Sequence, residues 1–121
     1  MTQTDVHIDS LVTAWLSLPE VADHLGIQVT RVRQLVRDRQ ILAIRRGENR
    51  ALYVPAAFIQ DGKVLKGLPG TLTLLADAGY GELEALRWLF TTDDSLPGAP
   101  VDALRENRGT EVKRRAQAAG F

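Results

Sequence analysis

Apolar residues along the first 40 positions recur mostly at helical spacing. Residues 1–10 show no such period and are polar and acidic, so we expect them to form a flexible tail. Four apolar residues follow at the i, i+1, i+4, i+5 spacing of a short amphipathic helix: Leu11, Val12, Trp15 and Leu16. The pattern therefore predicts one short helix behind a mobile leader.

Two further helices, joined by a tight turn, are predicted over residues 17–39. Ser17 and Glu20 have the spacing of a capping box, and Gly26 is placed to end the first of these helices in a left-handed C-cap. Thr30 is expected to cap the second helix. The apolar positions that would hold the pair together are Val21, Ala22, Leu25, Ile27, Val32, Leu35 and Val36. Two short helices with a glycine in the turn are typical of a helix-turn-helix.

After Gln40 the pattern changes to that of strands. Two β-prone runs, residues 41–44 and 51–54, flank a polar loop that contains Gly47 and Asn49. This favours a β-hairpin, and Pro55 is expected to close its second strand because proline has no amide hydrogen to donate.

The remaining residues return to a helical period. Two helices are indicated by the apolar stripes Leu68, Leu72, Leu75, Ala76 and Leu83, Leu86, Trp88, Leu89, Phe90. A turn-rich segment, residues 93–100, precedes a final helix predicted over about residues 101–119, with Gly109 as a weak point inside it. We therefore predict a mainly α fold with a short β-hairpin: a winged helix-turn-helix over 11–60, with C-terminal helices over 61–121 packed on it.

Positive charge is concentrated in the predicted helix-turn-helix and hairpin. The chain as a whole has a formal net charge of zero, but residues 18–58 contain seven arginines against four carboxylates. Arg31, Arg33, Gln34 and Arg37 lie off the apolar stripe of the second helix. Arginine can bond the O6 and N7 edge of guanine, glutamine can serve adenine, and Thr30 with the nearby amides can bind a phosphate. The alternative is a helical hairpin whose arginines form a solvated face.

The hairpin would extend this basic surface. A hairpin directly after a recognition helix is a wing, and Arg45, Arg46 and Arg50 near its tip would reach phosphates or the minor groove. The expected partner is double-stranded DNA. The alternative is a hairpin that only covers the core.

Composition excludes several other classes of protein. The chain has no cysteine and two histidines, so we expect neither disulfides nor a metal site. No apolar run approaches 18 residues and the first fifteen residues have no Lys or Arg, so we expect a cytoplasmic protein without a membrane partner. Residues 67–71 lack the lysine of a phosphate-binding loop, and residues 79–81 lack the third glycine of a dinucleotide fingerprint. We expect no enzyme activity and no cofactor.

The sequence also resembles known families. LPEVADHLGIQVTRVRQLVRDRQI, followed by the predicted hairpin and VPAAF, is similar to the winged helix-turn-helix of MerR-like and excisionase-like proteins. From about Leu16 to Phe121 the chain resembles an actinobacterial family of small winged-helix DNA-binding proteins, through VLKGLPGTLTLLADAGY, ALRWLFTTDDSL and PVDALRENRGTEVKRRAQA. The resemblance implies a transcriptional regulator with its recognition helix at about 30–39 and its wing at about 41–54. MerR proteins add a dimerising coiled coil and an effector domain, which are not found here, so an inducer is not expected.

Two further hypotheses concern the ends of the chain. Segments at residues 88–91, 100–104 and 109–112 are similar to the toxin-binding domain of Xre/MbcA/ParS-type antitoxins, which would make the C-terminal helices a protein-binding module. The alternative is that these helices only pack on the winged helix. In the N-terminal tail, Thr2 and Thr4 would be accessible to a Ser/Thr kinase, and the added phosphate charge would compete with DNA for the arginines. The alternative is an unmodified leader.

Overall fold

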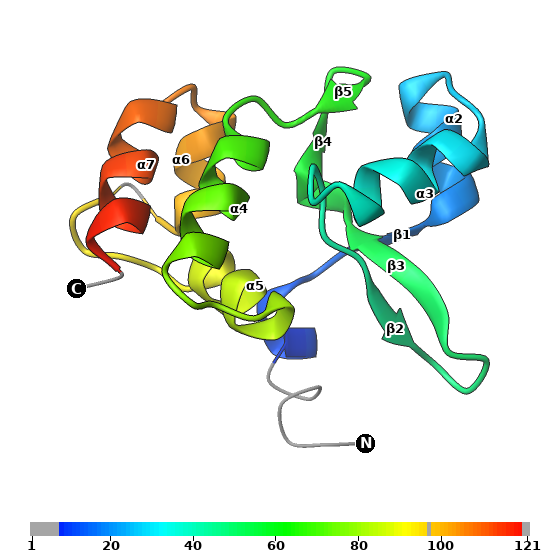
Figure 1. Cartoon of the computed structure of the whole chain (residues 1–121), viewed down its shortest axis with the longest axis horizontal. Helices are drawn as coiled ribbons and strands as arrows, with labels where there is room; N and C mark the ends of the chain where they lie inside the picture. The colour runs from blue at the N-terminus through cyan, green and yellow to red at the C-terminus, as the bar shows by residue number, and fades with distance from the viewer. Residues whose placement is uncertain (1–7, 97, 120–121) are drawn as a thin grey trace.

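The computed structural model describes residues 8–96 and 98–119. Two groups of elements lie side by side (Figure 1): the helix-turn-helix with its three-stranded sheet, and a group of helices formed by the second half of the chain. One continuous cluster of buried apolar side chains runs from Ile8 to Ala116 through both groups. The predicted fold class, mainly α with a small antiparallel sheet, is confirmed.

The segment before the helix-turn-helix differs from the prediction. Residues 8–11 are helical and Ile8 is fully buried, so the flexible tail predicted over residues 1–10 is wrong for positions 8–10. The helix predicted over 11–16 is also wrong, because Trp15–Ser17 form strand β1. Strand pairing decides the conformation of this short apolar run, whose period alone is ambiguous. Thr2 and Thr4 lie outside the described residues.

The helix-turn-helix consists of α2 (Leu18–Leu25) and α3 (Val29–Arg37). The capping box is confirmed: the Ser17 hydroxyl accepts from the Glu20 amide at 3.3 Å, and the Glu20 carboxylate accepts from the Ser17 amide at 2.9 Å. Gly26 ends α2 in the left-handed conformation with φ 67°, as expected. The second cap was predicted wrongly, since α3 begins one residue before Thr30 and Gln28 is its N-cap without a side-chain bond.

The predicted hairpin is present and belongs to a three-stranded antiparallel sheet. β2 (Ile44–Arg46) and β3 (Ala51–Pro55) form the wing, and β1 pairs with the other edge of β3. Pro55 ends β3, as predicted. The first strand begins later than predicted, because residues 41–43 are buried without strand pairing and connect α3 to the sheet.

A second, two-stranded hairpin was not predicted. A 3-10 turn (η1, Ala56–Phe58) leads into β4 (Ile59–Gln60) and β5 (Lys63–Val64). Between the strands, Asp61 and Gly62 have φ values of 54° and 73°. Two left-handed residues form the tight turn that Asp-Gly favours in hairpins, so the dipeptide was the signal for this element.

Four helices complete the chain: α4 (Leu68–Asp77), α5 (Glu82–Phe90), α6 (Pro100–Arg105) and α7 (Gly109–Ala118). The single helix predicted over 101–119 is wrong, because the chain turns between α6 and α7. Asn107 is left-handed there, with φ 64°, and Gly109 begins α7 instead of interrupting it.

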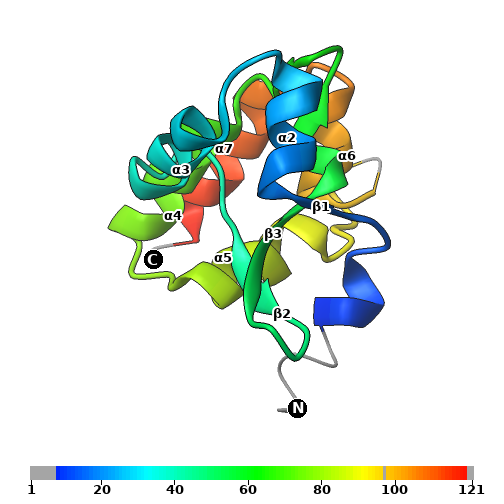
Figure 2. The same ribbon diagram turned by 90° about the vertical axis from the view of Figure 1, so that its right-hand side faces the viewer.

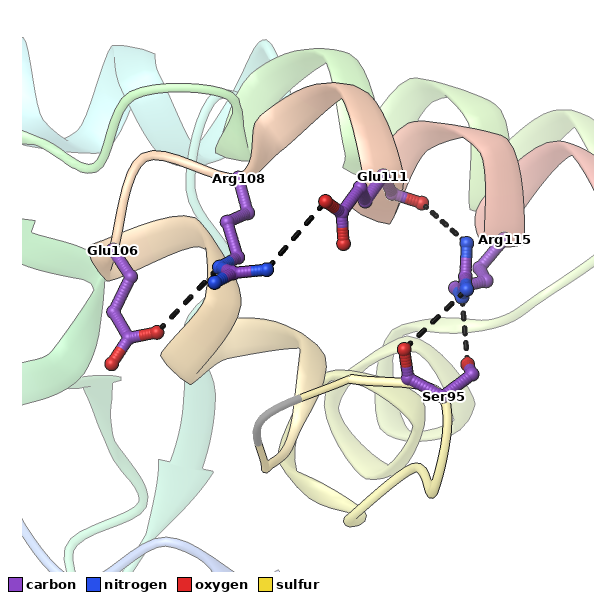
Figure 3. A network of polar contacts seen from close by, with 5 residues as sticks. All are labelled: Ser95, Glu106, Arg108, Glu111 and Arg115. Atoms are coloured by element: carbon purple, nitrogen blue, oxygen red, sulfur yellow. Dashed lines mark hydrogen bonds and ion pairs between the residues drawn. The ribbon is translucent and has the colours of Figure 1, made fainter.

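Polar contacts fix the loop before α6 to helix α7 (Figure 3). Arg115 donates from Nε to the Ser95 hydroxyl at 2.8 Å, and Arg108 lies between Glu106 and Glu111 at 3.8 and 3.6 Å. Hydrogen bonds from Ser95 lower the pKa of the Asp93 carboxyl in the same loop. This loop is therefore tied both internally and to α7.

Buried and polar contacts join the two halves of the chain. Arg105 donates from one guanidinium nitrogen to the carbonyls of Ala57 and Ile59, at 2.8 and 3.1 Å. Gln60 donates back to the Arg105 carbonyl at 3.2 Å, and the rings of Phe58 and Phe90 have centroids 5.7 Å apart. These contacts attach α5 and α6 to residues 57–60, which follow the three-stranded sheet.

Candidate nucleic-acid interface

Helix α3 presents two arginines whose side chains make no polar contact with the rest of the described chain. Val32 is fully buried against α2 and the core, which directs the neighbouring Arg31 and Arg33 to the surface. Thr30 is exposed beside them at the helix start. Both arginines therefore keep their five donors available for a ligand.

The remaining two predicted residues of α3 are bonded to each other. Arg37 donates to the Gln34 side-chain oxygen at 2.9 Å, and Gln34 donates from its amide nitrogen to Asp38 at 2.9 Å. Asp38 forms no ion pair with Arg37 in the described structure and is linked to it through the neutral amide of Gln34. These hydrogen bonds orient the Arg37 guanidinium. They also mean that the side-chain oxygen of Gln34 already accepts a bond from Arg37.

The three predicted wing arginines differ in their surroundings. Arg45 is exposed and donates to the Arg50 carbonyl at 2.9 Å, which ties the two sides of the tip together, and Arg50 is exposed. Arg46, by contrast, is half-buried, forms an ion pair with Asp9 and lies 4.3 Å over the Trp15 ring. Side chains alternate along a strand, so Arg45 and Arg46 leave β2 on opposite faces.

Helix α3 and the hairpin of β2 and β3 are separated by a surface hollow of about 430 Å³. Its lining includes Val36 of α3, Arg45, Arg50 and Leu52 of the wing, and Leu83 of α5. Figure 2 shows α3 above the hairpin formed by β2 and β3. Arg31, Arg33 and Arg37 therefore belong to α3, and Arg45 and Arg50 to the hairpin that meets α3 across this hollow, while Arg46 is engaged with Asp9 and Trp15.

Two exposed side chains next to this surface were not selected from the sequence. Arg39 follows α3 in a left-handed conformation with φ 56°, and its side chain has no polar partner within residues 8–96 and 98–119. Gln28 is the exposed N-cap of α3, and its side chain leaves the helix amides uncapped. Arg39 could have been found from its place in the arginine-rich segment, whereas Gln28 needed the true helix start.

In the described part of the chain, no three His, Cys, Asp or Glu side chains cluster in a way that would hold a metal ion. No described helix has the length and apolar character needed to cross a membrane.

Comparisons with known proteins agree with this architecture. Residues 3–59 match the family described as "DNA-binding protein Rv2175c, wHTH domain", and residues 65–120 match "Rv2175c C-terminal domain of unknown function". The DNA-binding protein Rv2175c of Mycobacterium tuberculosis (strain ATCC 25618 / H37Rv) is 41% identical, with 86% of this chain and 79% of the relative covered.

A solved structure gives the same result for the fold. The NMR structure of Rv2175c superposes with a TM-score of 0.79 at 40% identity, covering 89% of this chain and 82% of that chain. The resemblance to an actinobacterial winged-helix family is thereby confirmed. With both halves matched in order, the chain belongs to the family of the DNA-binding protein Rv2175c and carries its winged helix-turn-helix domain.

Proposed function

We propose that the protein binds double-stranded DNA as a transcriptional regulator, with α3 in the major groove and the wing on the adjacent backbone or minor groove. The observation that carries this proposal is the pair Arg31 and Arg33, exposed on a helix anchored by buried Val32 and free of carboxylate partners among the described residues. Unpaired guanidiniums on a rigid helix suit bidentate contacts to guanine. The family's DNA-binding member supports the same assignment.

In this proposal, residues at different positions contact different parts of the DNA. Arg31 and Arg33 would read base edges, with Gln34 and Arg37 acting as a bonded pair at the next turn of α3. Thr30 and the uncapped amides at the start of α3 would bind a phosphate. Arg45 and Arg50 would neutralise phosphates or enter the minor groove. Each phosphate contact steepens the loss of affinity with salt, by about 0.9 in the log–log slope.

Selection of bound duplexes from a random pool tests specific binding, and fluorescence anisotropy on the enriched site tests the residues. Arg31→Ala and Arg33→Ala should each weaken binding, by about 1–3 kcal/mol for a lost bidentate contact. Arg114→Ala is the matched control, since Arg114 is an exposed arginine of α7 in the other half of the chain. No enrichment, or equal affinities for all three variants, would contradict the proposal.

Regulation is a separate step of the proposal. A reporter gene placed behind the enriched site should change its output when the protein is expressed. Arg33→Ala should abolish the change at equal protein level. A reporter that responds equally to the wild type and this variant would leave the protein a DNA-binding protein without this regulatory role.

A second candidate function, protein binding by the C-terminal helices, is favoured by one groove. It has a volume of about 690 Å³ and is lined by two aromatic rings and by charged groups of both signs, among them Tyr80, Glu84, Arg87, Trp88 and Asp94. Nε of Arg87 is buried there without a hydrogen-bond partner among the described residues. Trp, Tyr and Arg are the residue types enriched at interaction hot spots, and the excess of carboxylates suits a basic peptide segment.

A peptide library displayed on phage would test this groove directly. Selection on the immobilised protein should enrich peptides with arginine or lysine, and Trp88→Ala should lose them while its DNA affinity stays unchanged. Peptides that bind the wild type and Trp88→Ala equally would place their site elsewhere. The absence of enrichment would remove this candidate.

A further inference from the structure

The wing arginine Arg46 is held by two residues from the segment that precedes the helix-turn-helix. It forms an ion pair with Asp9, and its guanidinium lies 4.3 Å over the ring of Trp15. The side chains of Arg46 and Asp9 are 29% and 34% exposed, so both remain within reach of solvent. No such contact with a carboxylate involves Arg45 or Arg50 in the described structure.

Asp9 is presented to Arg46 by a well-anchored turn. Ile8 and Val12, on either side of it, are buried, and the Val12 amide donates to the Ile8 carbonyl at 2.9 Å. In Figures 1 and 2 this turn (blue) lies beside the strand β2 of the hairpin. Asp9 and Arg46 also line a hollow of about 300 Å³ together with Arg45, Glu48 and Arg50 of the wing.

The register of the sheet places Trp15 and Arg46 on one face but four residues apart along β3, so Arg46 has to span that offset to stack on Trp15. β1 and β2 are the two edges of the sheet, with β3 between them, and Trp15 and Arg46 lie opposite Pro55 and Ala51 of β3. The long Arg46 side chain therefore runs along the sheet toward the N-terminal segment. Its direction is away from the tip that Arg45 and Arg50 occupy.

We propose that Asp9 sets the DNA affinity of the wing by competing with DNA phosphates for Arg46. The inference rests on the proposed DNA binding. In the free protein Asp9 neutralises Arg46, so the wing offers two arginines without an ion pair in the described structure instead of three. Asp9 acts through Arg46 and is a positioning residue.

The strength of the ion pair fits such competition. Partly exposed pairs are weak, and a duplex presents a dense row of phosphates to the same guanidinium. Removing the carboxylate therefore frees Arg46 for a phosphate. The added contact raises affinity, and the gain diminishes as salt screens the charges.

The test measures anisotropy on a duplex that the protein binds, over a range of salt concentrations. Asp9→Asn should tighten binding by about two- to fivefold at low salt, the range expected when a weak exposed pair is removed. The log–log salt slope should steepen by about 0.9, the value of one added phosphate contact. In the Arg46→Gln background Asp9→Asn should have no such effect.

Asp23→Asn is the matched control, because Asp23 is an exposed carboxylate of α2 with no ion pair among the described residues. Asp9→Ser provides a second way to remove the charge, and thermal unfolding checks that each variant is folded. Unchanged or weaker binding by both folded Asp9 variants overturns the inference. An equal gain with Asp23→Asn, or a gain that persists with Arg46→Gln, overturns it as well.

The same titrations separate the two proposals. If Arg31→Ala and Arg33→Ala lose affinity while Asp9→Asn does not gain it, only the role of Asp9 fails. If the wild-type protein binds no duplex, DNA binding and the role of Asp9 fail together.

Discussion

The guanidinium of Arg37 donates a hydrogen bond to the side-chain oxygen of Gln34, 2.9 Å away on the same face of α3. The bond makes one unit of two residues that were predicted to contact DNA separately. Gln34 is itself oriented by its bond to Asp38. The Arg37 side chain is therefore already ordered before any ligand arrives, which lowers the entropic cost of binding.

This pairing predicts that substitutions at the two positions do not add. Gln34→Ala removes the group that orients Arg37, so Arg37→Ala should cost less in the Gln34→Ala background than in the wild type. The coupling expected for residues in direct contact is about 0.5–3 kcal/mol. A double-mutant cycle by anisotropy measures it, with Arg33→Ala and Arg37→Ala as the uncoupled comparison. Strictly additive losses at Gln34 and Arg37 would contradict the prediction.

Truncating the side chain at position 32 should lower the free energy of unfolding far more than truncating its exposed neighbour Arg33. Val32 is fully buried, and Val32→Ala leaves a small cavity between α3 and the core, at a cost of about 1–3 kcal/mol of unfolding free energy. Arg33→Ala, one residue further, should change that free energy by no more than about 0.5 kcal/mol. Urea unfolding followed by circular dichroism compares the two. Equal stability of both variants would mean that α3 is not anchored as described.

The capping box makes a prediction that depends on pH. Ser17→Ala should destabilise the protein by about 1 kcal/mol at neutral pH, as is usual for a lost N-cap. Hydrogen bonds from the Ser17 backbone and side chain hold the pKa of the Glu20 carboxyl below its ordinary value of 4.5. A carboxyl with a lowered pKa in the folded state stabilises it above that ordinary value, and the effect disappears as the pH falls through the folded-state pKa.

The difference in melting temperature between wild type and Ser17→Ala should therefore narrow in acid. Thermal scans at pH 7 and at successive values below 4.5 follow it. Glu20→Gln is the control, because its amide keeps a hydrogen-bond acceptor but does not titrate in this range. A difference that stays constant into strong acid would mean that the Ser17 hydroxyl does not contribute to the lowered pKa of Glu20.

Replacing Arg105 should lower the free energy of unfolding more than replacing Arg108. Arg105→Met leaves the carbonyls of Ala57 and Ile59 without their donor, and losing charged hydrogen bonds at a partly buried site should cost about 2–3 kcal/mol. Arg108→Met breaks only exposed pairs with Glu106 and Glu111, which are worth about 1 kcal/mol or less. Chemical denaturation distinguishes them. A loss at Arg108 as large as that at Arg105 would refute the assignment.

Most of the helix-turn-helix could be predicted from the sequence because its signals are local. Ser17, Glu20 and Gly26 each act within four residues of their position, and all three have the roles assigned to them. The α3 boundary was one residue off because Gln28, a weak capping residue, holds the N-cap without a side-chain bond. The hairpin that forms the wing was identified, but its first strand was placed too early, since buried residues 41–43 look like a strand.

The errors concern contacts between distant parts of the chain. Trp15 is in a strand because β3, some forty residues later, pairs with it, and no local pattern contains that information. The engagement of Arg46 is of the same kind: its partner Asp9 was taken to lie in a mobile tail, so all three wing arginines looked equivalent. The number of arginines was visible in the sequence, whereas their availability depends on the fold.

The buried cluster that runs from Ile8 to Ala116 has a thermodynamic consequence. Because the core crosses the boundary between the two matched domains, neither half can unfold without exposing apolar surface of the other, and the protein should melt in one cooperative transition. Ligand binding stabilises the folded state as a whole under these conditions. A duplex bound at α3 would then slow amide hydrogen exchange in α7, although α7 lies outside the proposed DNA contacts.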